Sequence, residues 1–220
     1  MILYHGTSTI ASKSIIEEGK INPSIFSLSE YIQYIITNYE VSIDNLPSFY
    51  KVKHMRKNVY WLGNGIYGFG PSDYNLAKTW RTRYGKPRLS EEECSVIQFE
   101  INDKIAIDCF DFTAYRNRQE VKRFYDEYMA MVDNTHEGKL REKLLVFLSI
   151  VKDAFVSMDY KNQEHLLGLA IEMFIMNIEQ DIPFLKATFE KETDTKYFET
   201  YYAVRDNNLV KNIEEVEEVL

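Results

Sequence analysis

The apolar positions toward the two ends of the chain follow the short patterns typical of β-strands. Residues 1–5 form an apolar run suited to a buried strand, and residues 95–101 and 198–205 alternate between apolar and polar. An Asn-Asp turn after residue 101 predicts that residues 104–110 return as the second half of a hairpin. We expect a last strand at 209–213, so strands lie toward both ends of the chain.

Helical spacing of apolar residues dominates the middle of the chain. Residues 114–190 carry three such stripes, which predict three or four helices. Their breaks are expected at three places: 133–134, 159–160 and 181–183. Near the N-terminus, a helix is expected after the first strand, with Ser8 or Thr9 as N-cap and Gly19 as C-cap. Strands at both ends and helices between them predict an α+β fold.

The region between the first helix and residue 95 is more varied. Residues 31–36 have helical spacing, with Ser29 as a candidate N-cap. Residues 59–62 are expected to form a strand that runs into a glycine-rich segment at 63–70. Such glycines allow positive φ angles and close approach of a ligand to the backbone. A further helix is expected from Ser72 onward.

Composition narrows the class of protein. The chain has 220 residues, 45% of them hydrophobic and 27% charged, which excludes a disordered chain. Two cysteines exclude a disulfide scaffold and a four-cysteine zinc site. Without an apolar run of roughly 20 residues or a signal-peptide pattern, we expect a cytoplasmic protein with no membrane partner. The net charge of −8 disfavours broad phosphate-backbone binding, although the basic stretch 51–57 is either a solvated loop or a phosphate-holding patch.

Two clusters carry candidate chemistry, and no metal or covalent-nucleophile motif is present. His5 closes a buried strand before a glycine turn, where small ligands are often bound; a hydrogen-bonded core histidine is the alternative. Tyr67, framed by glycines, leads into a helix with Tyr74 and Trp80. Two aromatic faces there could enclose a planar cationic ring.

These clusters resemble the diphtheria-toxin-like ADP-ribosyltransferases, which include the poly(ADP-ribose) polymerases and carry a His-Tyr-Glu triad. The resemblance rests on residues 3–7 (LYHGT), 63–67 (GNGIY) and 77–80 (AKTW), and residues 202–206 (YAVRD) are similar to the last catalytic strand of that family. It covers about half of the chain, in three parts: 1–20, 59–110 and 196–213.

The resemblance implies a split β-sheet barrel with a helical insertion at about 114–190, all within a single domain of residues 1–220. It implies NAD as co-substrate and no metal. His5 would bind the adenosine ribose, Gly6 the nicotinamide amide, and Tyr67 with Trp80 or Tyr74 the nicotinamide ring. The implied catalytic residues are His5, Tyr67 and Glu199. The implied cofactor-binding residues are His5, Gly6, Thr7, Gly65, Tyr67, Tyr74, Trp80 and Tyr201.

The last strand departs from the family at the glutamate. Alignment on the Tyr-x-Val-x-Asp core places Tyr201 at the glutamate position, with Glu199 two residues earlier. Residues two apart on a strand share a face and lie about 7 Å apart, so a bulge could bring Glu199 into place. Alternatively, Glu199 is an ordinary surface residue, and Tyr201 or Glu100 becomes the next candidate.

The implied activity is mono-ADP-ribosyl transfer from NAD to a macromolecular acceptor, a protein or a nucleic acid, with NAD hydrolysis where no acceptor is present. A small transferase of this kind suits an intracellular toxin or phage-defence effector with a neutralising partner protein. The alternative is a catalytically inactive binding or regulatory module, and the carboxylate on the last strand separates the two. A third possibility is the RNA 2′-phosphotransferase branch of the fold, which expects basic residues where Tyr67 and Trp80 stand.

Overall fold

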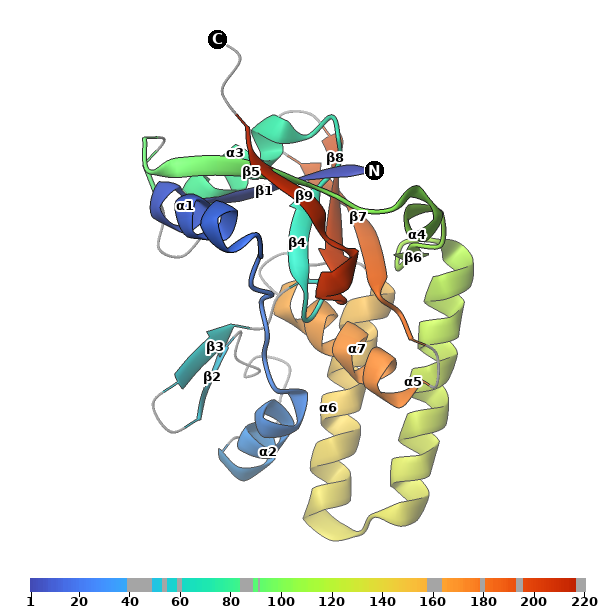
Figure 1. Ribbon diagram of the computed structural model, residues 1–220. Coiled ribbons are helices and arrows are strands. Elements are labelled where there is room, and N and C mark those ends of the chain that lie inside the picture. The colour runs from blue at the N-terminus through green and yellow to red at the C-terminus, as the bar shows by residue number, and fades with distance from the viewer. Residues whose placement is uncertain are drawn as a thin grey trace. The chain divides into compact units, whose positions relative to one another are not determined.

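The chain folds into two compact units that mix helices and strands (Figure 1). The computed structural model describes these stretches of the sequence: 1–38, 49–52, 55–58, 61–83, 89–90, 92–157, 164–178, 181–192 and 196–216. We call Met1–Ser24, Gly65–Phe112 and Ile182–Leu220 the sheet unit, and Ile25–Asn64 and Thr113–Asp181 the helical unit.

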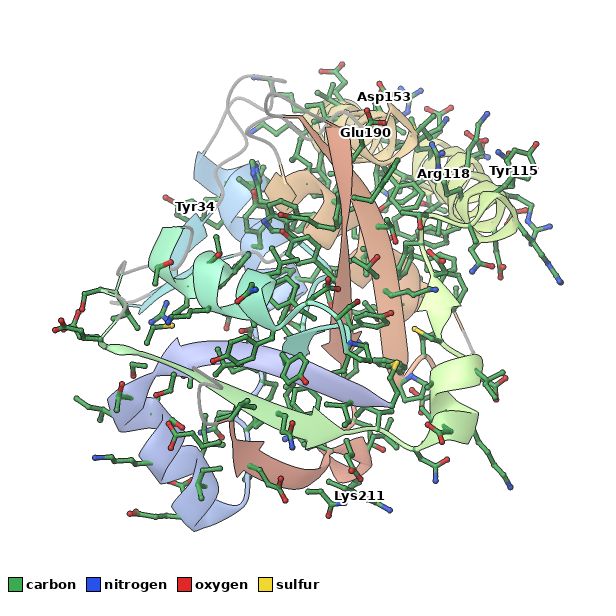
Figure 2. The ribbon with its side chains drawn as sticks, turned by 90° about the horizontal axis from the view of Figure 1, so that it is seen from above. Tyr34, Tyr115, Arg118, Asp153, Glu190 and Lys211 are labelled. Atoms are coloured by element: carbon green, nitrogen blue, oxygen red, sulfur yellow. The ribbon has the colours of Figure 1, made fainter. Side chains whose placement is uncertain are left out.

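The sheet unit is built on seven strands in the order β6-β7-β8-β4-β1-β5-β9. The strands are β1 (Ile2–Ser8), β4 (Ile66–Phe69), β5 (Cys94–Glu100), β6 (Phe110–Asp111), β7 (Phe184–Glu192), β8 (Lys196–Val204) and β9 (Lys211–Glu215). Neighbouring strands are antiparallel except for β6 and β7, which are parallel. Among the described strands the sheet is open, with β6 and β9 at its edges; Lys211 marks the start of β9 in Figure 2.

Short helices complete the sheet unit: α1 (Thr9–Glu18), α3 (Tyr74–Arg83), α4 (Asp103–Ile107) and the 3-10 turn η1 (Asn207–Leu209). Helix α3 packs on β1 and β5, and α1 packs on β5 and β9. An apolar core that includes Leu3, Ile66, Phe99 and Val204 lies on the sheet, and all four side chains are buried. Its members come from β1, β4, β5 and β8, so the core holds together strands that are distant in sequence.

The helical unit contains α2 (Leu28–Asn38), α5 (Tyr115–Thr135), α6 (Gly138–Ser157), α7 (Glu164–Asn177) and the hairpin of β2 (Phe49–Val52) and β3 (Met55–Asn58). Figure 1 shows α5 and α6 as a long antiparallel pair, joined by ion pairs of Arg141 with Asp133 and of Lys152 with Asp126. Every residue of α7 from 165 to 174 is buried, as expected of a helix that is apolar almost all round.

Several predicted elements are confirmed by the structure. Ser8 caps α1 through its side chain, which accepts from Ala11 N, and Gly19 ends the helix at φ 61°. Strand β5, strand β8 and the last strand also lie close to their predicted positions, as do the three helices α5 to α7.

The predicted cap of α2 and the predicted break after α5 were wrong. Ser27, rather than Ser29, accepts a hydrogen bond from Glu30 N at 3.4 Å, because the helix begins at Leu28, two residues earlier than a cap at Ser29 implies. Helix α5 continues past the predicted break at 133–134 and ends at Thr135. The predicted break at 159–160 lies outside the described residues.

The predicted hairpin after β5 was wrong. Asn102 accepts from Lys104 N through its side chain and thereby caps the helix α4, where a returning strand was expected. The edge of β5 pairs with β9, and β6 pairs with β7. The Asn-Asp pair that suggested a hairpin turn therefore begins a short helix.

Two further strands were misplaced or missed. The strand predicted at 59–62 was misplaced: residues 61–62 form a turn, and residues 59–60 lie outside the described residues. The strand that forms is β4, which lies within the glycine-rich segment 63–70. Residues 184–190, predicted to be helical, belong to β7, which pairs with β8 along nine residues. Both segments take their structure from partners far away in sequence.

The basic stretch 51–57 falls on β2 and β3, and its residues 53–54 lie outside the described residues. Within the described part of the chain, no helix combines the length and apolar character needed to cross a membrane.

Candidate functional site

His5 on β1 is held by the backbone of the neighbouring strand β4. Its Nδ1 lies 2.8 Å from the carbonyl oxygen of Tyr67. A carbonyl oxygen can only accept, so Nδ1 carries the proton, and in the neutral ring Nε2 is left as an acceptor. Desolvation lowers the pKa of His5; the hydrogen bond to Tyr67 opposes this, and the positive charge of Arg81 adds to it. The imidazole is therefore neutral near pH 7.

Tyr67 lies on β4 between β1 and β8, opposite Ala203 of β8. Its backbone thus supports His5, while its own half-buried ring emerges from the middle of the sheet. Gly65, just before β4, forms two backbone hydrogen bonds with Ser24, each 2.9 Å long. Thr7 is buried on β1, opposite Ser95. The structure therefore brings His5 and Tyr67 together and anchors the start of β4.

Gly6 allows α3 to approach β1 closely. A Cβ atom at Gly6 would lie 2.1 Å from the carbonyl oxygen of Ala77 and 3.3 Å from Cβ of Arg81. A side chain at this position would push the helix away from the strand. Gly6 therefore has a packing role that is sufficient to explain the glycine, and its contact with a nicotinamide amide stays a prediction.

The two candidate stacking residues point in different directions on α3. Tyr74 contacts the ring of Tyr4 edge to face, with ring centroids 5.7 Å apart. Trp80 follows six residues later and is half-buried. At 3.6 residues per turn, six residues place the two side chains about 120° apart around the helix. One of them at most can face the ring of Tyr67, which agrees with the predicted slot of Tyr67 and either Trp80 or Tyr74.

Glu199 and Tyr201 form a buried pair on β8. The phenol of Tyr201 donates to Glu199 Oε2 at 2.5 Å, and the two residues are only 5% and 3% exposed. The ring of Tyr201 lies between those of Phe69 and Phe189, with centroids 5.1 and 5.4 Å away. Glu199 is thus a buried carboxylate with a phenol partner, unlike an ordinary surface glutamate.

No bulge brings Glu199 toward Tyr67. The ladders of β8 with β7 and with β4 both run without a register shift. Ala203 lies opposite Tyr67, and Glu199 is four residues away along the strand, a distance of about 13 Å at the usual rise. Tyr201 is two residues closer than Glu199 to the position opposite Tyr67, and it lies on the same face of β8 as Glu199. Glu100, the other candidate carboxylate, is exposed on β5 and accepts from Asn212 Nδ2 at 2.6 Å.

A residue that sequence reasoning missed is Glu172, whose carboxylate is 1% exposed on α7. It accepts from the backbone N of Asn64 at 2.6 Å and from Asn64 Nδ2 at 3.2 Å. Asn64 also bonds the backbone N and O of Phe26, at 2.6 and 3.1 Å. The turn at residues 63–64, just before β4, is therefore fixed inside the helical unit. The signal in the sequence was a single carboxylate within the otherwise apolar run of α7.

Among the described residues, no group of three or more His, Cys, Asp or Glu side chains is arranged to hold a metal ion. The candidate residues thus provide a neutral imidazole at His5, a half-buried aromatic ring at Tyr67 and, farther along β8, a buried phenol–carboxylate pair. In comparisons with known proteins, no protein-family model, curated protein or solved structure matches the chain.

Proposed function

We propose that the protein is an NAD-dependent mono-ADP-ribosyltransferase whose sheet unit is a split-barrel variant of the diphtheria-toxin-like fold. The observation that carries the proposal is the hydrogen bond from His5 Nδ1 to the carbonyl oxygen of Tyr67. It joins the first two residues of the His-Tyr-Glu pattern and leaves His5 Nε2 as an acceptor. A neutral imidazole in this tautomer can accept a hydrogen bond from a ribose hydroxyl.

In this proposal NAD is a substrate, and the chain binds and polarises it. Tyr67 stacks on the positively charged nicotinamide ring, with Trp80 or Tyr74 as the second aromatic surface. The bond between nicotinamide N1 and ribose C1′ breaks, and its electron pair leaves with the neutral nicotinamide. The positive charge that develops at C1′ is stabilised by Glu199 or by the Glu199–Tyr201 pair. A nucleophile of a macromolecular acceptor, or water, then forms the new bond to C1′ and loses its proton.

The second candidate is a binding or regulatory module without turnover. It is favoured by the engagement of Glu199 with Tyr201 at 2.5 Å in a buried environment, and by the absence of a bulge in β8. A carboxylate already bonded to a neighbouring phenol has less capacity to hydrogen-bond a ribose. Such a module would still bind NAD through His5 and Tyr67.

The decisive experiment measures NAD binding by calorimetry and nicotinamide release by chromatography, with a cell extract supplied as the source of acceptor. In Tyr67→Ala we expect about 5- to 30-fold weaker NAD binding, because one aromatic face is lost. Tyr115→Ala is the matched control, since Tyr115 is 78% exposed and points outward from α5 in Figure 2. Unchanged NAD affinity in Tyr67→Ala would remove this site from consideration.

The biological role in this proposal depends on which macromolecule accepts the ADP-ribosyl group. Nuclease and protease digestion of the labelled product distinguishes a nucleic acid from a protein acceptor. A role as an intracellular toxin or phage-defence effector predicts that expression of the active protein slows growth, and that the corresponding inactive variant does not.

A further inference from the structure

The chain passes from the helical unit to the sheet unit at the turn before β4, three residues before Tyr67. Asn64 is the last residue of the helical unit here, and Gly65 begins the next segment of the sheet unit. Glu172 accepts hydrogen bonds from the backbone N and from Nδ2 of Asn64, at 2.6 and 3.2 Å. The turn is thus held by a carboxylate that lies 108 residues later in the sequence.

A second segment of the chain is tied to the same turn. Asn64 Oδ1 accepts from Phe26 N at 2.6 Å, and its Nδ2 donates to Phe26 O at 3.1 Å. One residue further along, Gly65 exchanges two backbone hydrogen bonds with Ser24, each 2.9 Å long. That segment also leaves the sheet unit at this point. Two connections between the units are therefore held together, and two of the four bonds depend on the Asn64 side chain that Glu172 orients.

Strand β4, which follows the turn, is paired unequally along its two edges. All four of its residues have partners on β8. Toward β1, the register pair among the described residues is Tyr4 with Phe69, at the far end of the strand. At the near end, His5 Nδ1 donates to the carbonyl oxygen of Tyr67 at 2.8 Å. A hydrogen bond weakens steeply as its geometry departs from the ideal, so this bond depends on where the chain enters β4.

The carboxylate of Glu172 constrains the turn in two ways. It is only 1% exposed, and a buried N–H group that loses its acceptor must find another one. It also fills the space beside the preceding residue, because a Cβ atom at Gly63 would lie 2.2 Å from Glu172 Oε1. Removal or displacement of the carboxylate is therefore expected to move the turn.

We propose that Glu172 is a positioning residue for the pair of His5 and Tyr67. Through the turn at 63–64 it sets where β4 begins, and thereby whether the carbonyl oxygen of Tyr67 reaches His5 Nδ1. The helical unit then determines the tautomer of His5 through the chain connection, without a ligand contact of its own. The consequence for NAD rests on the proposed function, whereas the effect on His5 does not.

The test is the tautomer of His5, measured by NMR from the nitrogen chemical shifts of the imidazole in the full chain without ligand. His5→Asn identifies the signals that belong to His5. In the wild type we expect the proton on Nδ1, and in Glu172→Ala a mixture of both tautomers, because the Tyr67 carbonyl no longer selects one. Glu172→Gln should restore most of the wild-type signal, since its amide oxygen can still accept from Asn64 N.

Two control variants separate positioning from general loss of stability. Leu148→Ala creates a cavity at a buried position of α6 in the same unit and removes no acceptor from the turn, so the His5 signals should match the wild type. Gly63→Ala should shift His5 in the same direction as Glu172→Ala, because its methyl group displaces the carboxylate. Gly138→Ala, which has a similar φ and open space, should not.

The outcomes judge the positioning role and the transferase separately. Wild-type His5 signals in folded Glu172→Ala would overturn the positioning role, and so would an equal shift in Leu148→Ala. If Glu172→Ala does not fold, Gly63→Ala decides in the same way. A shifted His5 in a protein whose wild type binds no NAD would support the positioning role and remove the transferase.

If the wild type binds NAD, Glu172→Ala should bind it at least about 2-fold more weakly, because only part of the molecules keep Nε2 of His5 as an acceptor. Calorimetry of both proteins provides the measurement. A shifted His5 with unchanged NAD affinity would support the positioning role and remove His5 as the ribose-binding residue.

Discussion

At the scale of single residues, the position of a proton on His5 determines what the side chain can bind. The carbonyl oxygen of Tyr67 fixes the proton on Nδ1, and desolvation lowers the pKa of the ring. The sequence pointed to His5 and Tyr67 through their motif spacing. It could not reveal the tautomer or the pairing of Glu199 with Tyr201, because both depend on contacts made only after the strands align.

The lowered pKa of His5 predicts acid destabilisation. Below the ordinary pKa of 6.5, the unfolded chain binds a proton that the folded protein does not bind, so stability falls as pH decreases from that value toward the lower folded pKa. His5→Asn keeps a donor for the carbonyl oxygen of Tyr67 and removes the titration. We expect denaturant unfolding between pH 7.5 and 5 to show a smaller loss of stability in His5→Asn than in the wild type. Equal losses would contradict a lowered pKa of His5 in the folded protein.

The thiols are expected to be unreactive. Burial raises the pKa of Cys109 to about 12 and also raises the pKa of Cys94. Only thiolate reacts with thiol reagents, so Cys109 in the folded protein should react at least ~100-fold more slowly at pH 8 than in the unfolded chain. Stopped-flow labelling of Cys94→Ala and Cys109→Ala, with and without guanidinium, assigns each rate. Fast labelling of folded Cys94→Ala would show that Cys109 is not protected.

The Glu199–Tyr201 pair is tested by two variants with opposite expected results. Glu199→Gln should lower nicotinamide release about 100-fold while NAD affinity is nearly intact, because charge stabilisation is lost in the transition state. Tyr201→Phe removes a hydrogen bond to a buried carboxylate and should cost about 1–3 kcal/mol of stability with most turnover retained. Equal loss of turnover in both variants would mark the pair as a positioning unit. Full activity in Glu199→Gln would discard Glu199 as the catalytic carboxylate.

At the scale of elements, local signals were sufficient where an element carries its own cap or periodicity. Helix α1 has Ser8 and Gly19 at its ends, and strand β5 has a clear alternation. Strands β4 and β7 lack such signals, and their structure comes from pairing with β8. Pairing with a strand that is distant in sequence can outweigh a local preference for helix. The stability gained by such pairing cannot be read from the sequence alone.

The turn before β4 gives an element-scale prediction. Gly63 has φ 73°, and a Cβ atom there would lie 2.2 Å from Glu172 Oε1. We expect Gly63→Ala to lose about 1–2 kcal/mol of stability to backbone strain and at least ~1 kcal/mol more to displacement of the buried carboxylate. Gly138→Ala is the matched control, because Gly138 has φ 60° and open space around it.

A double-mutant cycle of Gly63 and Glu172 tests whether displacement of the Glu172 carboxylate causes the extra loss of stability in Gly63→Ala. In a Glu172→Ala background the carboxylate is gone, so Gly63→Ala should cost only what Gly138→Ala costs. The same cost in both backgrounds would show that Glu172 does not constrain the glycine. Chemical denaturation of the four proteins of the cycle provides the measurement.

At the scale of the whole molecule, neither unit is a contiguous stretch of sequence. The sheet unit draws on three segments and the helical unit on two. The apolar stripes predicted α5 to α7, but the joining of residues 25–64 with 113–181 depends on contacts such as Lys143 Nζ to Ile36 O at 2.7 Å. Such long-range contacts leave no periodic signal.

This organisation predicts that the three long helices are not sufficient for a stable unit. A fragment of residues 113–181 lacks Asn64, which donates to the buried carboxylate of Glu172 through two hydrogen bonds. We expect the fragment to be helical by far-UV circular dichroism but to unfold without a cooperative transition. The same fragment joined through a linker to residues 25–64 should regain cooperativity. A cooperative transition in the short fragment would contradict the prediction.

The strand order also has a consequence for the emergence of the chain from the ribosome. Strand β1 can pair with β4 and β5 as soon as residue 100 is outside the exit tunnel, but the other neighbour of β4 is β8. The helices α5 to α7 are translated after β5 and before β8, so one edge of β4 stays unpaired during that time. Chemistry that requires both His5 and residues of β8 can therefore begin only after residue 204 has left the ribosome. The proposed site, which needs His5, Tyr67 and the Glu199–Tyr201 pair, is therefore incomplete for most of the synthesis of the chain.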